Sequence, residues 1–200
     1  MGRRAMDRAR KPLTEKAKTW VKDVVPLLQD KELDKLTLDG LAELMGKSKS
    51  TIYSYFSTKE EIYLTAVQLV LTDLDIVKIS KAVEGDDMEK ALRSMLMQIS
   101  QGIEGISISF LEQLKLQFPQ VWAMIEEFTS MVLTSLEFIY TKGMEQGTFK
   151  IFNVSLLTAL DRHFVMSIMT NASTFASQGM SLNDLVKEYL ELRLAALKVG

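Results

Sequence analysis

Residues 37–62 decide the fold of this chain and read TLDGLAELMGKSKSTIYSYFSTKEEI. Apolar residues recur at helical spacing in the first part, which predicts a short helix over 38–45 with Thr37 as its N-cap. Gly46 permits a tight turn, and a second short helix is predicted over 49–56. Two helices of this length, joined by a glycine-containing turn, have the size and spacing of a helix-turn-helix.

The second of these helices has a strongly polar surface. Only Ile52 and Phe56, four residues apart, can anchor it to a core. Small hydroxyl side chains let a helix approach the floor of a DNA groove, and Lys49 and the helix N-terminus offer donors to phosphates and base edges. A polar surface helix whose tyrosines cover the edge of a core would have a similar composition. The polar residues are Ser48, Lys49, Ser50, Thr51, Tyr53, Ser54 and Tyr55.

Helical patterning continues outward from this stretch, and it predicts an all-α chain of about nine helices. Only three prolines interrupt the 200 residues, and Pro26 is expected to kink or shorten the end of the first helix. Thr58 and Glu61 have the spacing of a capping box, which predicts the start of a long helix. The further helices are expected over 14–29, 59–80, 87–101, 106–118, 119–146, 154–176 and 183–198.

The charge of the chain is nearly balanced but unevenly placed. It has 24 basic and 26 acidic residues, which excludes a wholly basic nucleic-acid coat. Residues 1–60 hold 13 basic and 9 acidic side chains, whereas residues 61–200 hold 11 and 17. A basic N-terminal part on an acidic body indicates one end that faces a polyanion, although chance placement of charges explains the asymmetry equally well.

Other classes of protein are poorly supported. The chain has no cysteine and one histidine, His163, so neither a thiolate metal site nor a site with two imidazoles can form. No phosphate loop, dinucleotide fingerprint or nucleophile elbow is present, and we expect neither an enzyme nor a cofactor or metal. Charged residues interrupt the apolar run that a secretion signal needs, so the expected location is the cytoplasm.

The stretch 37–62 closely resembles the TetR family of bacterial transcriptional regulators, whose pattern is roughly TxxxIAxxAGVSxGTLYxYFxSKEEL. The segment GMEQGTF at 143–149 is similar to the loop that follows a long helix in that family. Lys47 departs from the pattern, since a small apolar residue is usual there, and Ser50 stands where glycine or alanine is frequent. The residues in register are Leu41, Ala42, Gly46, Ser48, Thr51, Ile52, Tyr53, Tyr55, Phe56, Thr58, Lys59, Glu60, Glu61 and Ile62.

The resemblance implies three parts and a DNA-binding surface. Residues 1–12 would be a disordered basic arm, 13–58 a helix-turn-helix DNA-binding domain, and 59–200 an effector-binding and dimerisation domain. The arginines of the arm (Arg3, Arg4, Arg8 and Arg10) would reach a minor groove or serve only as a solubilising tail. The residues implied to contact DNA are Thr37, Ser48, Lys49, Ser50, Thr51, Tyr53, Tyr55 and Lys59.

The helical body is expected to hold an effector and to dimerise. Methionines and aromatic residues between 88 and 169 can line an adaptable apolar pocket, although such residues are also ordinary core. The resemblance implies a dimer bundle from the last two helices, with packing inside one chain as the alternative. The candidate effector residues are Phe110, Trp122, Phe138, Arg162, His163 and Met166. The candidate dimer residues are Leu160, Phe164, Ile168, Leu185, Tyr189 and Leu192.

The sequence therefore predicts a homodimeric regulator that binds a palindromic DNA operator, most simply a repressor released by a small lipophilic or aromatic effector. Two alternatives stay open. One is an architectural DNA-binding dimer of the same fold that senses no small molecule, and the other is a helical interaction module that has lost DNA binding.

Overall fold

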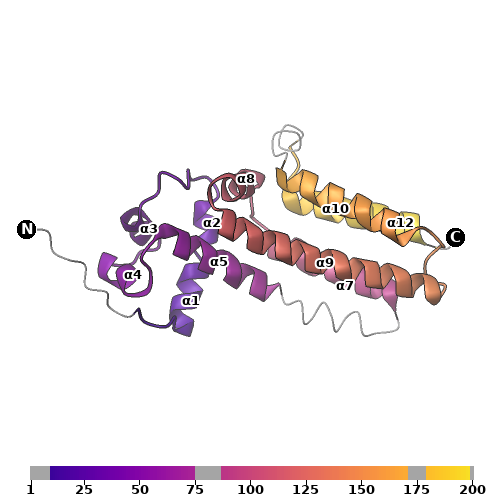
Figure 1. The fold of residues 1–200 in the computed structure, drawn as a ribbon, viewed down its shortest axis with the longest axis horizontal. Helices are drawn as coiled ribbons and strands as arrows, with labels where there is room; N and C mark the ends of the chain where they lie inside the picture. The colour runs from indigo at the N-terminus through magenta and orange to yellow at the C-terminus, as the bar shows by residue number, and fades with distance from the viewer. Residues whose placement is uncertain (1–9, 75–86, 171–178, 199–200) are drawn as a thin grey trace, which may run out of the picture.

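The computed structural model describes residues 10–74, 87–170 and 179–198, and these ranges are helical with a single isolated β-bridge between Phe149 and Lys198. This confirms the all-α class, with an N-terminal helix-turn-helix and a C-terminal helical body (Figure 1). No helix in these ranges is long and apolar enough to cross a membrane. The described helices are α1 (Glu15–Lys22), α2 (Val25–Leu28), α3 (Leu38–Leu44), α4 (Lys49–Tyr55), α5 (Lys59–Asp73), α7 (Met88–Gly102), α8 (Ile108–Gln117), α9 (Pro119–Glu145), α10 (Val154–Thr170) and α12 (Leu182–Leu197).

Polar caps begin the helices where the sequence predicts them. The Thr37 and Thr58 hydroxyls accept from backbone N–H groups in the first turns of α3 and α5. Ser181 and Asp184 form a capping box at α12. The last residues of the expected helix 59–80 and of 154–176 lie outside the described residues.

The first expected helix, 14–29, is instead two helices. Thr14 caps α1, which ends at Lys22, and α2 begins at Val25 with Pro26 in its first turn. Proline lacks the N–H that a continuous helix would need at this position, but the first turn of a new helix does not use that donor. The effect of Pro26 is therefore a break before it rather than a kink after it.

The helix-turn-helix lies at one end of the molecule, and α10 and α12 lie toward the other end, where α10 packs against the long α9 and α12 against α7 (Figure 1). A continuous apolar core joins the two parts, because buried residues of α1 to α4 share one cluster with buried residues of α5, α8 and α9. α5 packs against both α1 and α9. A displacement inside the body can thus reach the helix-turn-helix through packed side chains.

Gly143 in α9 shows why the segment 143–149 needs a glycine. A Cβ there would lie 2.0 Å from the ring of Phe149, which is buried directly against the helix. The turn is completed by Gly147, which has a positive φ of 74°. This close approach fixes the chain reversal that leads from α9 to α10.

Candidate nucleic-acid interface and effector cavity

The turn between α3 and α4 sets the angle at which α4 is presented. Gly46 has a φ of 62°, and the backbone N–H of Lys47 donates to the Ala42 carbonyl over 2.9 Å. Ile52 is fully buried and Phe56 nearly so, which holds α4 by one face only. The opposite face carries the exposed Lys49, Ser50 and Tyr53.

Lys47, the departure from the family pattern, has a structural role. Its ammonium lies 5.8 Å from the centre of the Trp20 ring, at a cation–π distance. Trp20 also meets Tyr55 and Phe56 edge to face, with centroids 6.0 and 6.4 Å apart. The ring of Tyr55 is therefore half-buried in an aromatic cluster that supports α4.

The exposed face of α4 contains an ion pair that the sequence did not reveal. The Lys49 ammonium donates to Asp39 over 2.6 Å, and the Tyr53 hydroxyl donates to the other oxygen of Asp39 over 3.2 Å. The hydrogen bond and charge of Lys49 lower the pKa of Asp39, and those of Asp39 raise the pKa of Lys49. Lys49 thus stays charged and is oriented by a residue of α3.

The hydroxyl groups at the start of α4 are connected to one another. Ser48 is the N-cap of α4, and its Oγ accepts from the backbone N–H of Thr51 over 3.2 Å. The same oxygen lies 2.8 Å from Thr51 Oγ1 and 3.0 Å from Ser50 Oγ. Thr37 has the equivalent capping role at α3, which occupies its side-chain oxygen. These four residues are held in fixed positions by the local structure.

Lys59 is half-buried at the first position of α5. Its ammonium donates to the carbonyls of Leu33 (3.0 Å) and Asp34 (2.5 Å) and lies 5.8 Å from the Phe118 ring centre. An ammonium has three donors, so one stays available for a phosphate. Lys59 also ties the segment before α3 to the body.

We expect Lys59→Ala to weaken DNA binding by a similar factor for all sequences and to reduce the slope of log affinity against log salt by about one, because one phosphate contact is lost. Fluorescence polarisation over a salt series measures both quantities. Thermal unfolding of the variant shows whether the loss of the Lys59 hydrogen bonds to the segment before α3 destabilises the fold. A variant with the affinity and salt slope of the parent chain would refute the phosphate contact.

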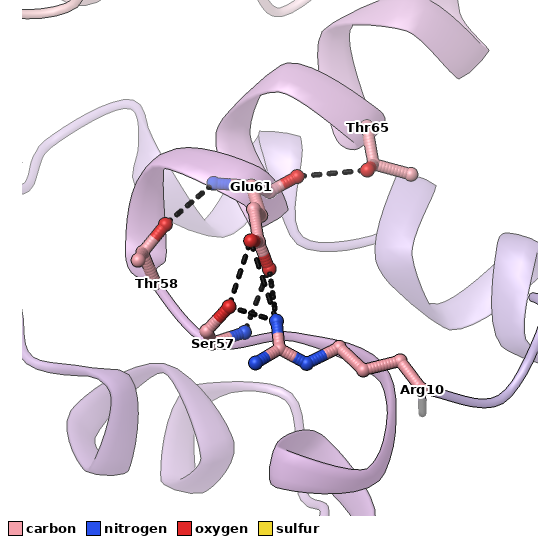
Figure 2. Close-up of polar contacts among 5 residues, drawn as sticks. All are labelled: Arg10, Ser57, Thr58, Glu61 and Thr65. Carbon is pink, nitrogen blue, oxygen red and sulfur yellow. Dashed lines mark hydrogen bonds and ion pairs between the residues drawn. The ribbon is translucent and has the colours of Figure 1, made fainter. Parts of the chain in front are cut away.

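Figure 2 shows a second polar cluster, where the chain passes from α4 to α5. The Glu61 carboxylate accepts from the Ser57 backbone N–H (2.6 Å) and from the Ser57 hydroxyl (2.8 Å). Arg10 pairs with the same carboxylate over 3.1 Å, and the N–H of Lys11 donates to the Ser54 carbonyl over 3.1 Å. The N-terminal segment is thus attached beside the C-terminus of α4, whereas Arg3, Arg4 and Arg8 lie outside the described residues.

Glu61 makes this turn dependent on pH. Burial raises the pKa of the carboxyl, but the hydrogen bonds from Ser57 and the charge of Arg10 outweigh burial and lower it below its ordinary value of 4.5. A lowered pKa in the folded state contributes stability above the ordinary pKa, and this contribution disappears as the pH falls through the folded pKa.

We therefore expect Glu61→Gln to unfold more easily than the parent chain at neutral pH and to approach it in stability below about pH 4. Denaturant unfolding of both proteins at a series of pH values measures this difference. A difference that stays constant from neutral to acidic pH would show that the charge of Glu61 does not stabilise the turn.

The helical body contains a partly open apolar cavity of about 180 Å³. Among the lining side chains in the described part of the chain, only Thr129 and Tyr189 carry an oxygen or nitrogen atom, and the Thr129 hydroxyl donates to the Ile125 carbonyl of its own helix over 2.8 Å. The wall includes Val25 of α2 as well as side chains of the body. A cavity of this kind favours an uncharged, lipophilic occupant.

The structure brings only one of the six candidate effector residues, Phe110, into the wall of this cavity. Trp122 is buried elsewhere, with its Nε1–H donating to Glu126 over 2.8 Å. Met166 is half-buried against the core without lining the cavity. The other three, Phe138, Arg162 and His163, lie on the exposed surface.

The candidate dimer residues divide into two groups. Leu160 and Leu192 are 51% and 70% exposed, and Leu156, one turn before Leu160, is 59% exposed. These three leucines of α10 and α12 are not covered by the described part of the chain. The other four candidates, Phe164, Ile168, Leu185 and Tyr189, pack within the chain.

A helix-turn-helix at one end and a hollow helical body behind it define a class: two-domain helical proteins with a DNA-binding head. The family model of bacterial regulatory proteins, tetR family, matches residues 25–66. Residues 25–66 are thus similar to the TetR family, and the chain as a whole has the fold of a solved regulator of that family.

A curated relative and several solved structures are similar to the chain. An uncharacterized HTH-type transcriptional regulator, YvaF of Bacillus subtilis (strain 168), is 26% identical over 99 residues, which cover 46% of this chain and 49% of that protein. The chain thus matches about half the length of this relative.

Among solved structures, the TetR family regulator PfmR from Thermus thermophilus has a TM-score of 0.66 at 22% identity, over 90% of this chain and 99% of PfmR. The fatty acid degradation regulator FadR from Bacillus halodurans has a TM-score of 0.65 at 21% identity, over 92% and 97%. FadR from Bacillus subtilis, solved in complex with stearoyl-CoA, has a TM-score of 0.63 at 18% identity, over 89% and 98%. At these identities the likeness concerns the fold.

Proposed function

We propose that this chain is a dimeric transcriptional regulator that binds a palindromic operator and is released from it by a small lipophilic effector. The observation that carries this proposal is the presentation of α4. Two buried residues, Ile52 and Phe56, hold it from behind, and its exposed face consists of hydroxyls, a tyrosine and an oriented lysine. In this proposal residues 13–58 read DNA and residues 59–200 bind the effector and dimerise.

The cavity supports the effector part of the proposal. Dry apolar cavities of about 150 Å³ admit benzene, so a cavity of 180 Å³ has room for a small aromatic or alkyl compound. A protein of the same fold, FadR of Bacillus subtilis, was solved in complex with stearoyl-CoA. A complex between a protein of this fold and a long-chain acyl compound therefore has a precedent.

Two glutamines connect the cavity wall to the DNA-binding head. The side chain of Gln113, on α8, accepts from the Leu33 N–H (2.8 Å) and donates to the Lys31 carbonyl (2.9 Å). The buried Gln29 side chain accepts from the Ser107 N–H over 2.6 Å. Because α8 also contributes Phe110, Leu111 and Leu114 to the wall, an occupant that shifts α8 would move residues 29–33.

The exposed leucines of α10 and α12 support the dimer part of the proposal. Leu156, Leu160 and Leu192 are exposed on α10 and α12, and these two helices lie toward the end of the molecule away from the helix-turn-helix. Pairing of two chains across this surface would leave both heads free to read two half-sites of one operator. The dimer raises affinity without any new type of contact.

The test is a selection of genomic DNA fragments with the purified protein, followed by binding of the selected duplex over a salt series. We expect specific binding that weakens steeply with salt. Saturating the cavity with a small aromatic compound is expected to weaken binding by about 5- to 150-fold, the usual range of allosteric coupling. If no duplex is selected at low salt, the proposal that this chain is a DNA-binding regulator is refuted. Undiminished binding with the cavity filled would favour the architectural alternative.

A further inference from the structure

A second hollow, the polar pocket, adjoins the apolar cavity and has a volume of about 480 Å³. Its walls come from the C-terminal end of α1, the start of α2, the C-terminal parts of α5 and α7, and the loop after α7. The polar pocket and the cavity share four apolar wall residues, Val25, Val70, Leu74 and Ile106. The cavity is partly open, and these four side chains lie where its apolar interior meets the polar pocket.

The described wall of the polar pocket carries more negative than positive charge. Lys22 of α1 and Asp73 of α5 both line it and form an ion pair with each other. Asp23 and Glu104 also line it, and both are exposed. The side chains of these two residues form no hydrogen bond or ion pair with the rest of the described chain. After the Lys22–Asp73 pair is set aside, two negative charges remain on this wall.

The two hollows together favour a molecule with two unlike ends. The cavity can take a hydrocarbon group but not a charge, because a charge there would lose its hydration without gaining a partner. A charged group on the same molecule would therefore lie in the polar pocket, which water and polar side chains share. A wall with one sign of charge attracts ions of the opposite sign and repels ions of its own sign. Asp23 and Glu104 thus favour a positively charged group over a carboxylate or a phosphate.

We propose that the effector is a cationic amphiphile, such as an alkylamine, whose hydrocarbon part fills the apolar cavity and whose ammonium group lies in the polar pocket. This inference rests on the proposed effector function of the cavity and assigns its ligand class. The ammonium group would lie beside Lys22, Asp23 and Pro26, which belong to the DNA-binding head. The effector would therefore contact the head directly as well as the body.

Three probes with the same hexyl chain test the inference: hexylamine, which is positive at neutral pH, hexan-1-ol, which is neutral, and hexanoate, which is negative. The chain has as many carbons as benzene, which a cavity of similar size admits. Calorimetry at low salt gives the affinity of each probe for the parent chain. We expect hexylamine to bind about tenfold more tightly than hexanoate, with hexan-1-ol between them, and the difference to shrink at high salt.

The double variant Asp23→Asn with Glu104→Gln removes both carboxylates from the polar pocket and changes no residue of the cavity wall. We expect it to bind hexylamine about fivefold more weakly than the parent chain and hexan-1-ol equally well. The matched control is Glu127→Gln with Glu137→Gln, which removes two exposed carboxylates of α9 that line neither hollow. This control is expected to leave both affinities unchanged.

Unchanged binding of hexan-1-ol by the Asp23 and Glu104 double variant shows that the cavity is intact. The cationic ligand class is overturned, and the cavity stays an effector site, if hexylamine binds no more tightly than hexan-1-ol or if hexanoate binds most tightly. Equal losses of hexylamine affinity in the two double variants overturn the placement of the ammonium group in the polar pocket. If none of the three probes binds the parent chain, the proposed effector function of the cavity is overturned as well.

Discussion

Replacing Arg193 by methionine is expected to lower the free energy of unfolding by about 3 kcal/mol, because the change leaves a buried carboxylate without its counter-charge. Asp161 on α10 is fully buried, and Arg193 on α12 is its ion-pair partner. Methionine keeps much of the arginine stem, so packing is largely retained and the lost interaction is the ion pair. Denaturant unfolding, monitored by circular dichroism, measures the change.

The matched variant is Arg193→Met combined with Asp161→Asn, which removes the buried charge together with its partner. We expect the double variant to regain part of the lost stability, since the amide still accepts from Tyr140 and carries no charge. If Arg193→Met alone is as stable as the parent chain, the ion pair with Arg193 does not stabilise the buried Asp161 carboxylate.

The pair lies beside the exposed Leu160 and Leu192 in sequence, so the same variant should also weaken dimerisation by disturbing the arrangement of α10 and α12.

Lys49→Ala is expected to lower affinity for the operator by roughly tenfold or more and to alter the sequence preference, as loss of a direct groove contact does. Two effects act in the same direction. The positive charge of Lys49 is lost, and Asp39, which pairs with Lys49 over 2.6 Å, keeps only its hydrogen bond from Tyr53 among the described residues and would repel the DNA phosphates.

The double variant Lys49→Ala with Asp39→Asn separates these effects, because it removes the unpaired carboxylate. We expect it to recover part of the affinity, and polarisation with the selected duplex at fixed salt measures all three proteins. Lys150→Ala, an exposed lysine between α9 and α10, is the control for net charge and is expected to bind as the parent chain does. If Lys49→Ala and Lys150→Ala lose the same amount of affinity for the duplex, the loss reflects net charge and α4 makes no specific contact with DNA.

The sequence predicted the starts of helices better than the burial of individual side chains. Thr37 and Thr58 mark helix starts because capping depends on the nearest three or four residues. The division of the first helix before Pro26 was less visible, since the missing N–H of proline can either kink a helix or begin a new one.

Long-range partners could not be read from spacing. Asp39 and Lys49 come from different helices, and their contact depends on the angle set at Gly46. On α10, Asp161 is fully buried, whereas the next residue, Arg162, is exposed. The helical pattern there is apolar almost all round, so it does not reveal which side packs against α9. For the same reason only Phe110 of the six candidate effector residues lies in the wall of the cavity, although α8, α9 and α10, which carry these candidates, all contribute to that wall.

The most direct test of the central claim is a hydroxyl-radical footprint of the protein on a selected duplex. Two α4 helices, related by the twofold axis of a dimer, should each occupy a major groove. We predict two protected half-sites related by a palindrome, with centres roughly one helical turn, about 34 Å, or a whole number of turns apart. Protection must be lost from both half-sites in Lys49→Ala at the same protein concentration. A single unbroken protected stretch, or a footprint that Lys49→Ala leaves unchanged, would contradict the reading of DNA by paired α4 helices.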